Sequence, residues 1–318
     1  MIFIVSSSFI SACAPPDLSD IACMVAQYGH FIKASNSDYK IFRQAVKDHG
    51  STNQKECFRN HLEIFDIPDN LFRYLRCIDI DDSFTSKDFL HLITSQSRLI
   101  TENANNEWPV YKHFIDVYKS DPTYSDVFTL LKKAKDKNHL TGIQAGGAGE
   151  LLKSANQNSY EFHGKNLTHL KTCVLFDRDT DNDTYFDGNK NPLFKALAGK
   201  THLTITDDDI YQLSHEPLTW HMWYKRAIEN YFPDEQYIKA GFDPSPLNTM
   251  TQHQRDYALI GGKKSNPQLV NDYSKGALKD LLSGFSRAKI EKHLKVFNVN
   301  GENISEIQLF LLKLVKII

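Results

Sequence analysis

The sequence lacks several features that define common functional classes. Its five cysteines include no Cys-x-x-Cys pair, so neither a zinc knuckle nor a disulfide framework is indicated, and free thiols in a reducing cytoplasm are expected. No apolar run approaches the length of a membrane span, and no Gly-x-x-x-x-Gly-Lys-Ser/Thr stretch provides a nucleotide-binding loop. These absences predict a cytoplasmic protein without membrane contact and without an ATPase site of its own.

An excess of positive charge is also missing, because the formal net charge is -2. Nucleic-acid-binding proteins often carry a basic balance, so any contact with phosphates must come from a local patch or from bound metal. The candidate patch for nucleic acid is formed by Lys132, Lys133 and Lys135, and a second basic stretch covers 287–295. Both stretches also fit the solvated faces of helices.

Three regions of the chain differ in their patterning. Residues 1–96 and 236–318 follow mostly helical periodicity without a catalytic motif, although the apolar start of the first region favours a buried strand. Residues 97–235 alternate strand and helix patterns, as in a parallel sheet. The sequence therefore predicts an α/β fold with a parallel sheet flanked by helices. The helical regions at both ends are expected to serve docking and regulation.

Acidic residues follow two of the three strand candidates in the central region. The candidates are 98–101, 141–145 and 172–176; Glu102 follows the first and Asp177 follows the third. Active sites of parallel sheets lie at the carboxyl ends of their strands. Glu102 and Asp177 are therefore expected to lie close together.

The stretch after the third strand candidate places carboxylates at alternate positions, Asp177, Asp179 and Asp181. Hard divalent cations prefer oxygen ligands, and Mg²⁺ usually takes one or two carboxylates and keeps some of its water. Asp177 and Asp179 can share one ion from a single turn, with Glu102 arriving from another strand. The same residues also fit a solvated acidic turn without a ligand.

A calcium loop of the EF-hand type is a further alternative for this acidic stretch. That loop requires Gly at its sixth position and Glu at its twelfth. Counting from Asp177, these positions hold Asn182 and Gly188, and a strand precedes the loop where an EF-hand has a helix. The EF-hand pattern therefore fails.

The order of these elements resembles the Toprim domain over about residues 97–235. A Glu ends one strand, a Gly-rich turn at 146–149 ends the next, and an Asp-x-Asp follows a third. The downstream Ile-Glu-Asn-Tyr at 228–231 is similar to Toprim nucleases of the OLD (overcoming lysogenization defect) group and to stand-alone Toprim effectors of bacterial anti-phage defence. Asn103 stands where that family has Gly, and Asn106 stands where it has a second acid, with Glu107 adjacent.

The resemblance implies a metal-dependent endonuclease that uses Mg²⁺ or Mn²⁺, as two ions. It implies that metal is held by Glu102, Asp177, Asp179 and Asp181, and that Glu229 is a ligand, orients a metal-bound water or caps a helix. The family also uses a distal lysine, for which Lys275 is the candidate, with Lys279 or Lys263 and Lys264 as alternatives. Lone histidines such as His163, His169 and His221 are general-base candidates but are usually structural.

The resemblance further implies how such a chain is used in the cell. OLD-type nucleases typically work with an ATPase, so a partner ATPase is expected to restrain a nuclease effector, and a homo-oligomer is possible. By analogy with stand-alone Toprim effectors, RNA such as transfer RNA is favoured over DNA as substrate. Two alternatives stay open: an interaction module whose acidic loop binds metal only structurally, and a Toprim topoisomerase or primase-like enzyme.

Overall fold

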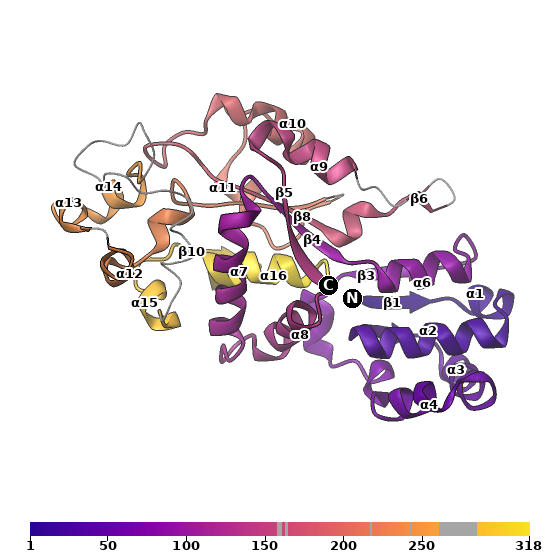
Figure 1. Cartoon of the computed structure of the whole chain (residues 1–318). Helices are drawn as coiled ribbons and strands as arrows, with labels where there is room; N and C mark the ends of the chain where they lie inside the picture. Colours follow the sequence, from indigo (N-terminus) through magenta and orange to yellow (C-terminus); the bar gives the residue numbers. More distant parts are fainter. Residues whose placement is uncertain (158–160, 163–164, 217, 242, 261–284) are drawn as a thin grey trace.

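Two parallel sheets with helices on their faces make up the protein, as the sequence predicts for its fold class (Figure 1). The computed structural model describes residues 1–157, 161–162, 165–216, 218–241, 243–260 and 285–318. Within these residues, no helix is both long and apolar enough to cross a membrane. The N-terminal and central regions each build one of the sheets, and the two are therefore described in turn.

The N-terminal region contains a three-stranded parallel sheet in the order β2-β1-β3. Its elements are β1 (Ile2–Val5), α1 (Ser7–Ala12), α2 (Pro15–Tyr28), β2 (Phe31–Lys33), α3 (Asn36–His49), α4 (Thr52–Arg59), the 3₁₀ helix η1 (Leu62–Phe65), α5 (Asp69–Tyr74), β3 (Cys77–Ile80) and α6 (Ser86–Thr94). Helix α2 contacts α3, α4 and α6. The first strand was predicted. The region was otherwise expected to be mostly helical, so the parallel sheet with β1 as its central strand was missed.

Most of the N-terminal residues pack in a hydrophobic cluster of their own. Phe3 of β1 and Phe89 of α6 meet edge to face with ring centroids 4.8 Å apart, and both side chains are fully buried. The cluster joins apolar residues between Met1 and Ile93, whereas most residues beyond them belong to a second cluster. Separate cores are the physical basis for treating the N-terminal region as a distinct packing unit.

The central sheet is parallel throughout and has the order β5-β4-β8-β9. Its elements up to the third strand are β4 (Ser97–Thr101), α7 (Ala104–Tyr118), α8 (Ser125–Asp136), β5 (Leu140–Gln144), η2 (Ala148–Glu150), α9 (Leu151–Gln157), the strands β6 (Glu161–Phe162) and β7 (Lys165–Asn166), η3 (Thr168–Lys171) and β8 (Thr172–Phe176). After β8 come η4 (Gly188–Lys190), α10 (Asn191–Ala198), α11 (Asp207–Ile210), β9 (Thr219–Met222) and η5 (Ile228–Tyr231).

Helices cover both faces of the central sheet because its crossovers run in opposite directions. The connection from β4 to β5 moves one way across the sheet and carries α7 and α8, whereas the return from β5 to β8 carries α9. Right-handed crossovers in opposite directions place their helices on opposite faces. Figure 1 shows this arrangement, with α9 and α10 on one side of the strands and α7 on the other.

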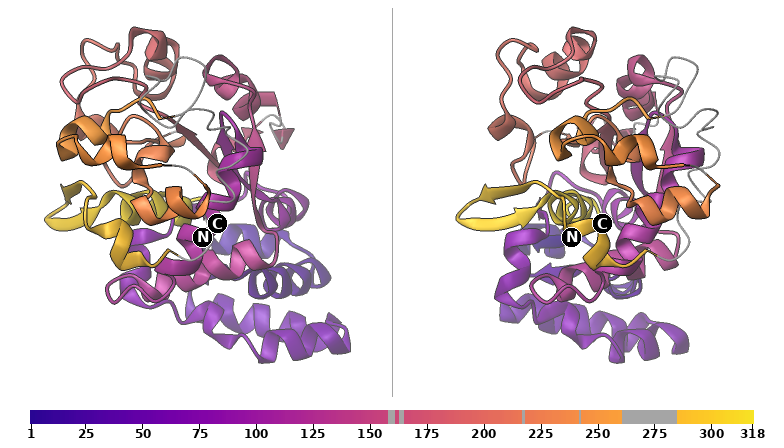
Figure 2. Two further views of the ribbon diagram at one scale, coloured as in Figure 1. Left: turned by 60° about the vertical axis from the view of Figure 1, so that its left-hand side comes forward. Right: turned by 90° about the vertical axis from the view of Figure 1, so that its left-hand side faces the viewer.

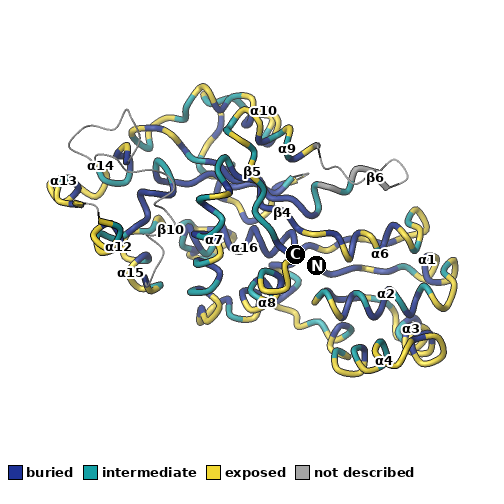
Figure 3. Tube along the Cα trace, in the orientation of Figure 1, coloured by how far each residue is buried: buried dark blue, intermediate teal, exposed yellow. Residues whose placement is uncertain are grey.

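The C-terminal region combines short helices, a hairpin and one central helix. Its described elements are α12 (Asp234–Lys239), α13 (Ser245–Asn248), α14 (Gln252–Asp256), α15 (Arg287–Glu291), β10 (Val296–Val299), β11 (Glu302–Ser305) and α16 (Glu306–Val315). The hairpin of β10 and β11 was not predicted. Helix α16 contacts α7, α8 and β9, and it is dark along its length when the chain is coloured by burial (Figure 3).

Helix α16 therefore belongs to the core of the central sheet. Leu309, Phe310 and Leu312 are fully buried in the same cluster as the strands. Phe310 lies against Trp223 and Tyr111, with ring centroids 5.0 and 5.5 Å apart. The C-terminal region was expected to serve docking, but its last helix fills the interior. Figure 2 shows the two chain ends side by side, next to this helix.

We predict that Gly142→Ala destabilises the protein by about 1–3 kcal/mol, because Trp108 of α7 covers this residue of β5. A Cβ atom at Gly142 would lie 2.7 Å from the Trp108 Cγ atom, so the indole must shift. The matched control is Gly149→Ala, where an added Cβ meets no atom within 4 Å. Urea unfolding of both variants provides the measurement, and equal midpoints would contradict the close packing of α7 on β5.

Candidate functional site

The pairing of β4 with β8 brings two acidic residues to the same edge of the central sheet. The strands are parallel neighbours, with Leu99 opposite Cys173 and Ile100 opposite Val174. Continuing this register places Glu102 opposite the end of β8, one residue before Asp177. Both strands are buried along their length. The predicted proximity of Glu102 and Asp177 thus follows from strand order and register.

A glycine turn after β5 closes over the backbone of Glu102. Gly146 donates its backbone N–H to the carbonyl oxygen of Glu102 at 3.3 Å. Gly146 and Gly147 have φ angles of 88° and 135°, which side-chain-bearing residues rarely adopt. The Gly-rich turn predicted after this strand is therefore present and lies beside the acidic edge.

Asp177 lies within an acidic cluster, which we define as Glu102, Glu107, Asp177, Asp179 and Glu229. Protein atoms surround the Asp177 carboxyl group closely enough for burial to raise its pKa well above the ordinary value, and the four other carboxylates raise the pKa further. Glu107 and Glu229 are themselves almost fully buried. Like charges gathered in a space with little water oppose ionisation, so Asp177 holds a proton more tightly than an ordinary aspartate.

Lys190 supplies positive charge to this acidic cluster. Its Nζ atom lies 3.0 Å from a carboxylate oxygen of Glu102 and 2.7 Å from one of Asp179, and its side chain is almost fully buried. Burial alone would lower the pKa of Lys190, but the two carboxylates outweigh that effect and raise the pKa. The sequence analysis missed this residue, because a single lysine before Asn-Pro has the pattern of a helix start at the surface.

Asp179 is held in an unusual backbone conformation at the cluster. Its φ angle is 61°, and its backbone N–H donates to the carbonyl oxygen of Arg226 at 2.9 Å. Left-handed conformations of residues other than glycine occur most readily at Asn and Asp, and they concentrate at functional sites. The bond to Arg226 fixes the turn after β8 against the segment that follows β9.

Glu229 is presented by a rigid turn, the short helix η5. The Asn230 side chain accepts from the backbone N–H of Ala227 at 3.1 Å and donates to the carbonyl oxygens of Arg255 and Ala258 at 2.9 and 3.0 Å. The Tyr231 hydroxyl accepts from the backbone N–H of Lys225 at 3.1 Å. The Ile-Glu-Asn-Tyr element thus fixes its own backbone, and its glutamate lies near enough to Asp177 to raise the pKa of that carboxyl group.

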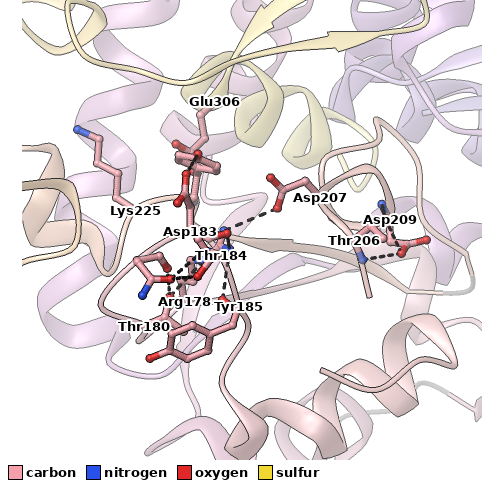
Figure 4. Close-up of polar contacts among 12 residues, drawn as sticks. Arg178, Thr180, Asp183, Thr184, Tyr185, Thr206, Asp207, Asp209, Lys225 and Glu306 are labelled. Atoms are coloured by element: carbon pink, nitrogen blue, oxygen red, sulfur yellow. Dashed lines mark hydrogen bonds and ion pairs between the residues drawn. The ribbon is translucent and has the colours of Figure 1, made fainter. Parts of the chain in front are cut away.

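Arg178 anchors the loop that follows the acidic turn, as Figure 4 shows. Its guanidinium is buried and donates to the Thr180 hydroxyl at 3.2 Å and to the carbonyl oxygen of Asp183 at 3.0 Å. Asp181 lies on the exposed side of this loop and accepts from the Tyr185 hydroxyl at 2.8 Å. Asp181 was expected to be a metal ligand, but its hydrogen bonds direct it toward Tyr185.

The remaining predicted residues lie elsewhere or outside the described part of the chain. Lys132 and Lys135 form ion pairs with Asp116 and Asp136, which neutralises much of the predicted basic patch, and Lys133 is exposed beside them. His221 is fully buried at 3.9 Å from Glu306, and burial lowers its pKa well below the ordinary value. The lysines and the histidine that lie outside the described residues are Lys263, Lys264, Lys275, Lys279 and His163.

The donor chemistry of the acidic cluster fits a hard divalent cation, because all its side chains offer carboxylate oxygens. Across the residues that the structure describes, however, no group of three or more His, Cys, Asp or Glu side chains is arranged closely enough to hold an ion. The Lys190 ammonium lies between two of the carboxylates. In this structure the Lys190 ammonium therefore occupies the position between Glu102 and Asp179 that a metal ion would take.

Comparisons of the chain with protein-family models, with curated proteins and with solved structures found no match. The resemblance to Toprim nucleases consequently stays a prediction from the sequence motifs.

We predict that Asp177→Asn stabilises the metal-free protein at neutral pH, on the order of 1 kcal/mol. The raised pKa of Asp177 contributes stability below the unfolded-state pKa, and this contribution is lost as the pH rises toward the folded-state value. The stabilisation by Asn should therefore grow between pH 4 and pH 8. Urea unfolding across this range measures it, with the exposed Asp181→Asn as the control. A difference between Asp177→Asn and wild type that does not vary with pH would contradict the proximity of the carboxylates.

We also predict that Lys190→Gln destabilises the metal-free protein by about 1–3 kcal/mol, because two carboxylates lose their charged donor. Added Mn²⁺ should raise the melting temperature of this variant more than that of the wild type. The control is Lys195→Gln, an exposed lysine of α10. Equal Mn²⁺ effects in all three proteins would show that the ammonium and the ion do not share a site.

Proposed function

We propose that the acidic cluster is the active site of a divalent-metal-dependent nuclease of the Toprim type. The observation that carries this proposal is the bridge of Lys190 between Glu102 and Asp179 at the carboxyl edge of a parallel sheet, beside Asp177, whose pKa is raised by burial and by nearby carboxylates. Such an edge is where α/β sheets place their ligands. The order of Glu, Gly-rich turn and Asp-x-Asp along the chain supports the same proposal.

Four residues of the acidic cluster have proposed roles. Glu102 and Asp179 are the proposed metal ligands, because both already contact one cation. Asp177 and Glu229 are proposed to bind a second cation or to accept a proton from a metal-bound water molecule. Mg²⁺ or Mn²⁺ bound there supplies an activated water and stabilises charge on a phosphodiester.

Lys190 then has a place in the proposed function. In the metal-free protein its ammonium compensates the negative charge of Glu102 and Asp179. A divalent ion held by Glu102 and Asp179 would compete with this ammonium for the same carboxylates. We propose Lys190 as the lysine of the active site, a part for which the sequence analysis gave the distal Lys275 as the candidate.

The cellular part of the proposal rests on the resemblance to OLD-type and stand-alone Toprim effectors. We propose an anti-phage nuclease that a partner ATPase restrains and releases, with RNA, such as transfer RNA, favoured over DNA. A near-neutral net charge gives little attraction to bulk nucleic acid, which favours selective cleavage.

The test incubates purified protein with Mg²⁺ or Mn²⁺ and with transfer RNA, messenger RNA or duplex DNA. We expect metal-dependent cleavage that falls at least 100-fold in Asp177→Ala and Glu102→Gln, whereas the exposed Asp208→Asn keeps full activity. Co-expression with an ATPase encoded by a neighbouring gene should remove toxicity, if the proposed restraint is correct.

Each other outcome of this test has a defined meaning. Activity in Asp177→Ala at normal expression would overturn the nuclease proposal. Metal binding by the cluster without cleavage of any substrate would favour the alternative function, an interaction module whose acidic loop binds metal only structurally. Degradation of DNA alone would reverse the preference for RNA.

A further inference from the structure

A second site candidate lies at the opposite end of the strands that carry the acidic cluster. A cavity of about 310 Å³ opens between the N-terminal unit and the amino ends of β4 and β8. Ser97 begins β4 and Lys171 directly precedes β8, and both residues line it. The N-terminal unit contributes Tyr28 of α2, His30 from the loop before β2 and Ile64 of η1 to its wall.

The wall of this cavity is rich in basic groups. Lys133, Lys137 and Lys171 line it and supply its positive charge. His30, His61 and His139 line it too, but burial lowers the pKa of His30 and His139, so these two rings contribute as neutral imidazoles. Among the described lining residues, Glu63 contributes the one carboxylate side chain. A concave surface with this balance attracts anions, and its low-dielectric walls strengthen the attraction.

Lys171 is the buried centre of this basic wall. Its side chain is 3% exposed, and its Nζ atom lies 3.4 Å from the Nε2 atom of His30. Among the described residues, no carboxylate forms an ion pair with it. Burial lowers the pKa of Lys171 to about 7, as expected for an ammonium without a counterion.

His30 gives Lys171 little compensation for its burial. Its Nε2 atom lies 3.3 Å from the carbonyl oxygen of Ile93, and its Nδ1 atom lies 3.4 Å from the backbone nitrogen of Met1. A neutral imidazole has one donor and one acceptor nitrogen. If Nε2 donates to Ile93, it offers Lys171 no lone pair. If Nδ1 carries the proton instead, Nε2 can accept from Lys171, and the Met1 nitrogen, whose pKa burial lowers well below the ordinary value, can accept from Nδ1. His30 therefore offers at most one acceptor to the three donors of the Lys171 ammonium.

We propose that this cavity binds a phosphate-bearing small molecule, whose oxygens supply the acceptors that Lys171 lacks. The remaining wall fits an organic portion, because the rings of Tyr28 and His139 are stacked with centroids 4.2 Å apart and Ile64 and Leu130 are apolar. The volume lies at the lower end of the range for small-molecule sites. A mononucleotide has the size and the chemistry that this wall would recognise.

The proposal is independent of the nuclease function, and it is tested by calorimetric titration of the full chain with AMP, inorganic phosphate or adenosine. AMP should bind most tightly, phosphate more weakly and uncharged adenosine not at all. Lys171→Met should weaken AMP binding at least 10-fold. The matched control is Lys316→Met, which removes another buried lysine, one that bonds the carbonyl oxygens of Arg73 and Leu75 and does not line the cavity.

A second variant keeps the proposal testable if Lys171→Met does not fold. Lys133→Ala combined with Lys137→Ala changes two exposed residues of the wall and should weaken AMP binding several-fold. Binding of AMP that is unchanged in both variants would overturn the assignment. Binding of phosphate and AMP with equal affinity would overturn the organic portion, and absence of binding at millimolar concentration would overturn the site.

Discussion

The parallel pairing of β4 with β8 is the constraint on which both the fold and the acidic cluster depend. It places Glu102 beside the end of β8, and it buries the two strands between helices on both faces. Repulsion among the gathered carboxylates works against this arrangement. Lys190 offsets it from a third element, because it bonds Glu102 and Asp179 at once. Strand pairing and ammonium placement therefore depend on each other.

Other ionisable side chains are also buried in the interior, where backbone groups bond them. Lys313 of α16 is fully buried and donates to the carbonyl oxygens of Ile210 and Trp220, and burial lowers its pKa to about 7. Glu306 at the start of the same helix is also fully buried, and burial raises its pKa to about 7. Buried charges of this kind are tolerated when backbone groups satisfy their hydrogen bonds. Lys171 departs from this rule, since its described contact is a histidine ring nitrogen.

The sequence predicted the parts of the fold that are expressed in local patterns. The strands near Glu102 and Asp177 form where predicted, because short apolar runs bounded by turn residues specify buried strands. The N-terminal sheet escaped prediction, because β2 and β3 are only three and four residues long. The central position of α16 was also missed, although its local sequence carries the signal, because a helix that is apolar on nearly all sides is typically buried.

The acidic cluster shows the same division between local and long-range information. The proximity of Glu102 and Asp177 was predictable, since parallel strands align their carboxyl ends. The position of Lys190 in the acidic cluster was not predictable, because this lysine becomes buried only when the loop after β8 folds back over the sheet edge. The outward turn of Asp181 was likewise hidden, since it depends on a bond to Tyr185 in the same loop.

The two site candidates lie at opposite ends of the same pair of strands, which limits how they can influence each other. Transmission between distant sites requires an element with two discrete arrangements. The strands β4 and β8 are fully buried and hydrogen-bonded, so they offer no such alternative. The cavity, by contrast, is walled by both packing units. An anion bound there would act first on the attachment of the N-terminal unit, and the geometry of the carboxylates would follow only if that attachment changed.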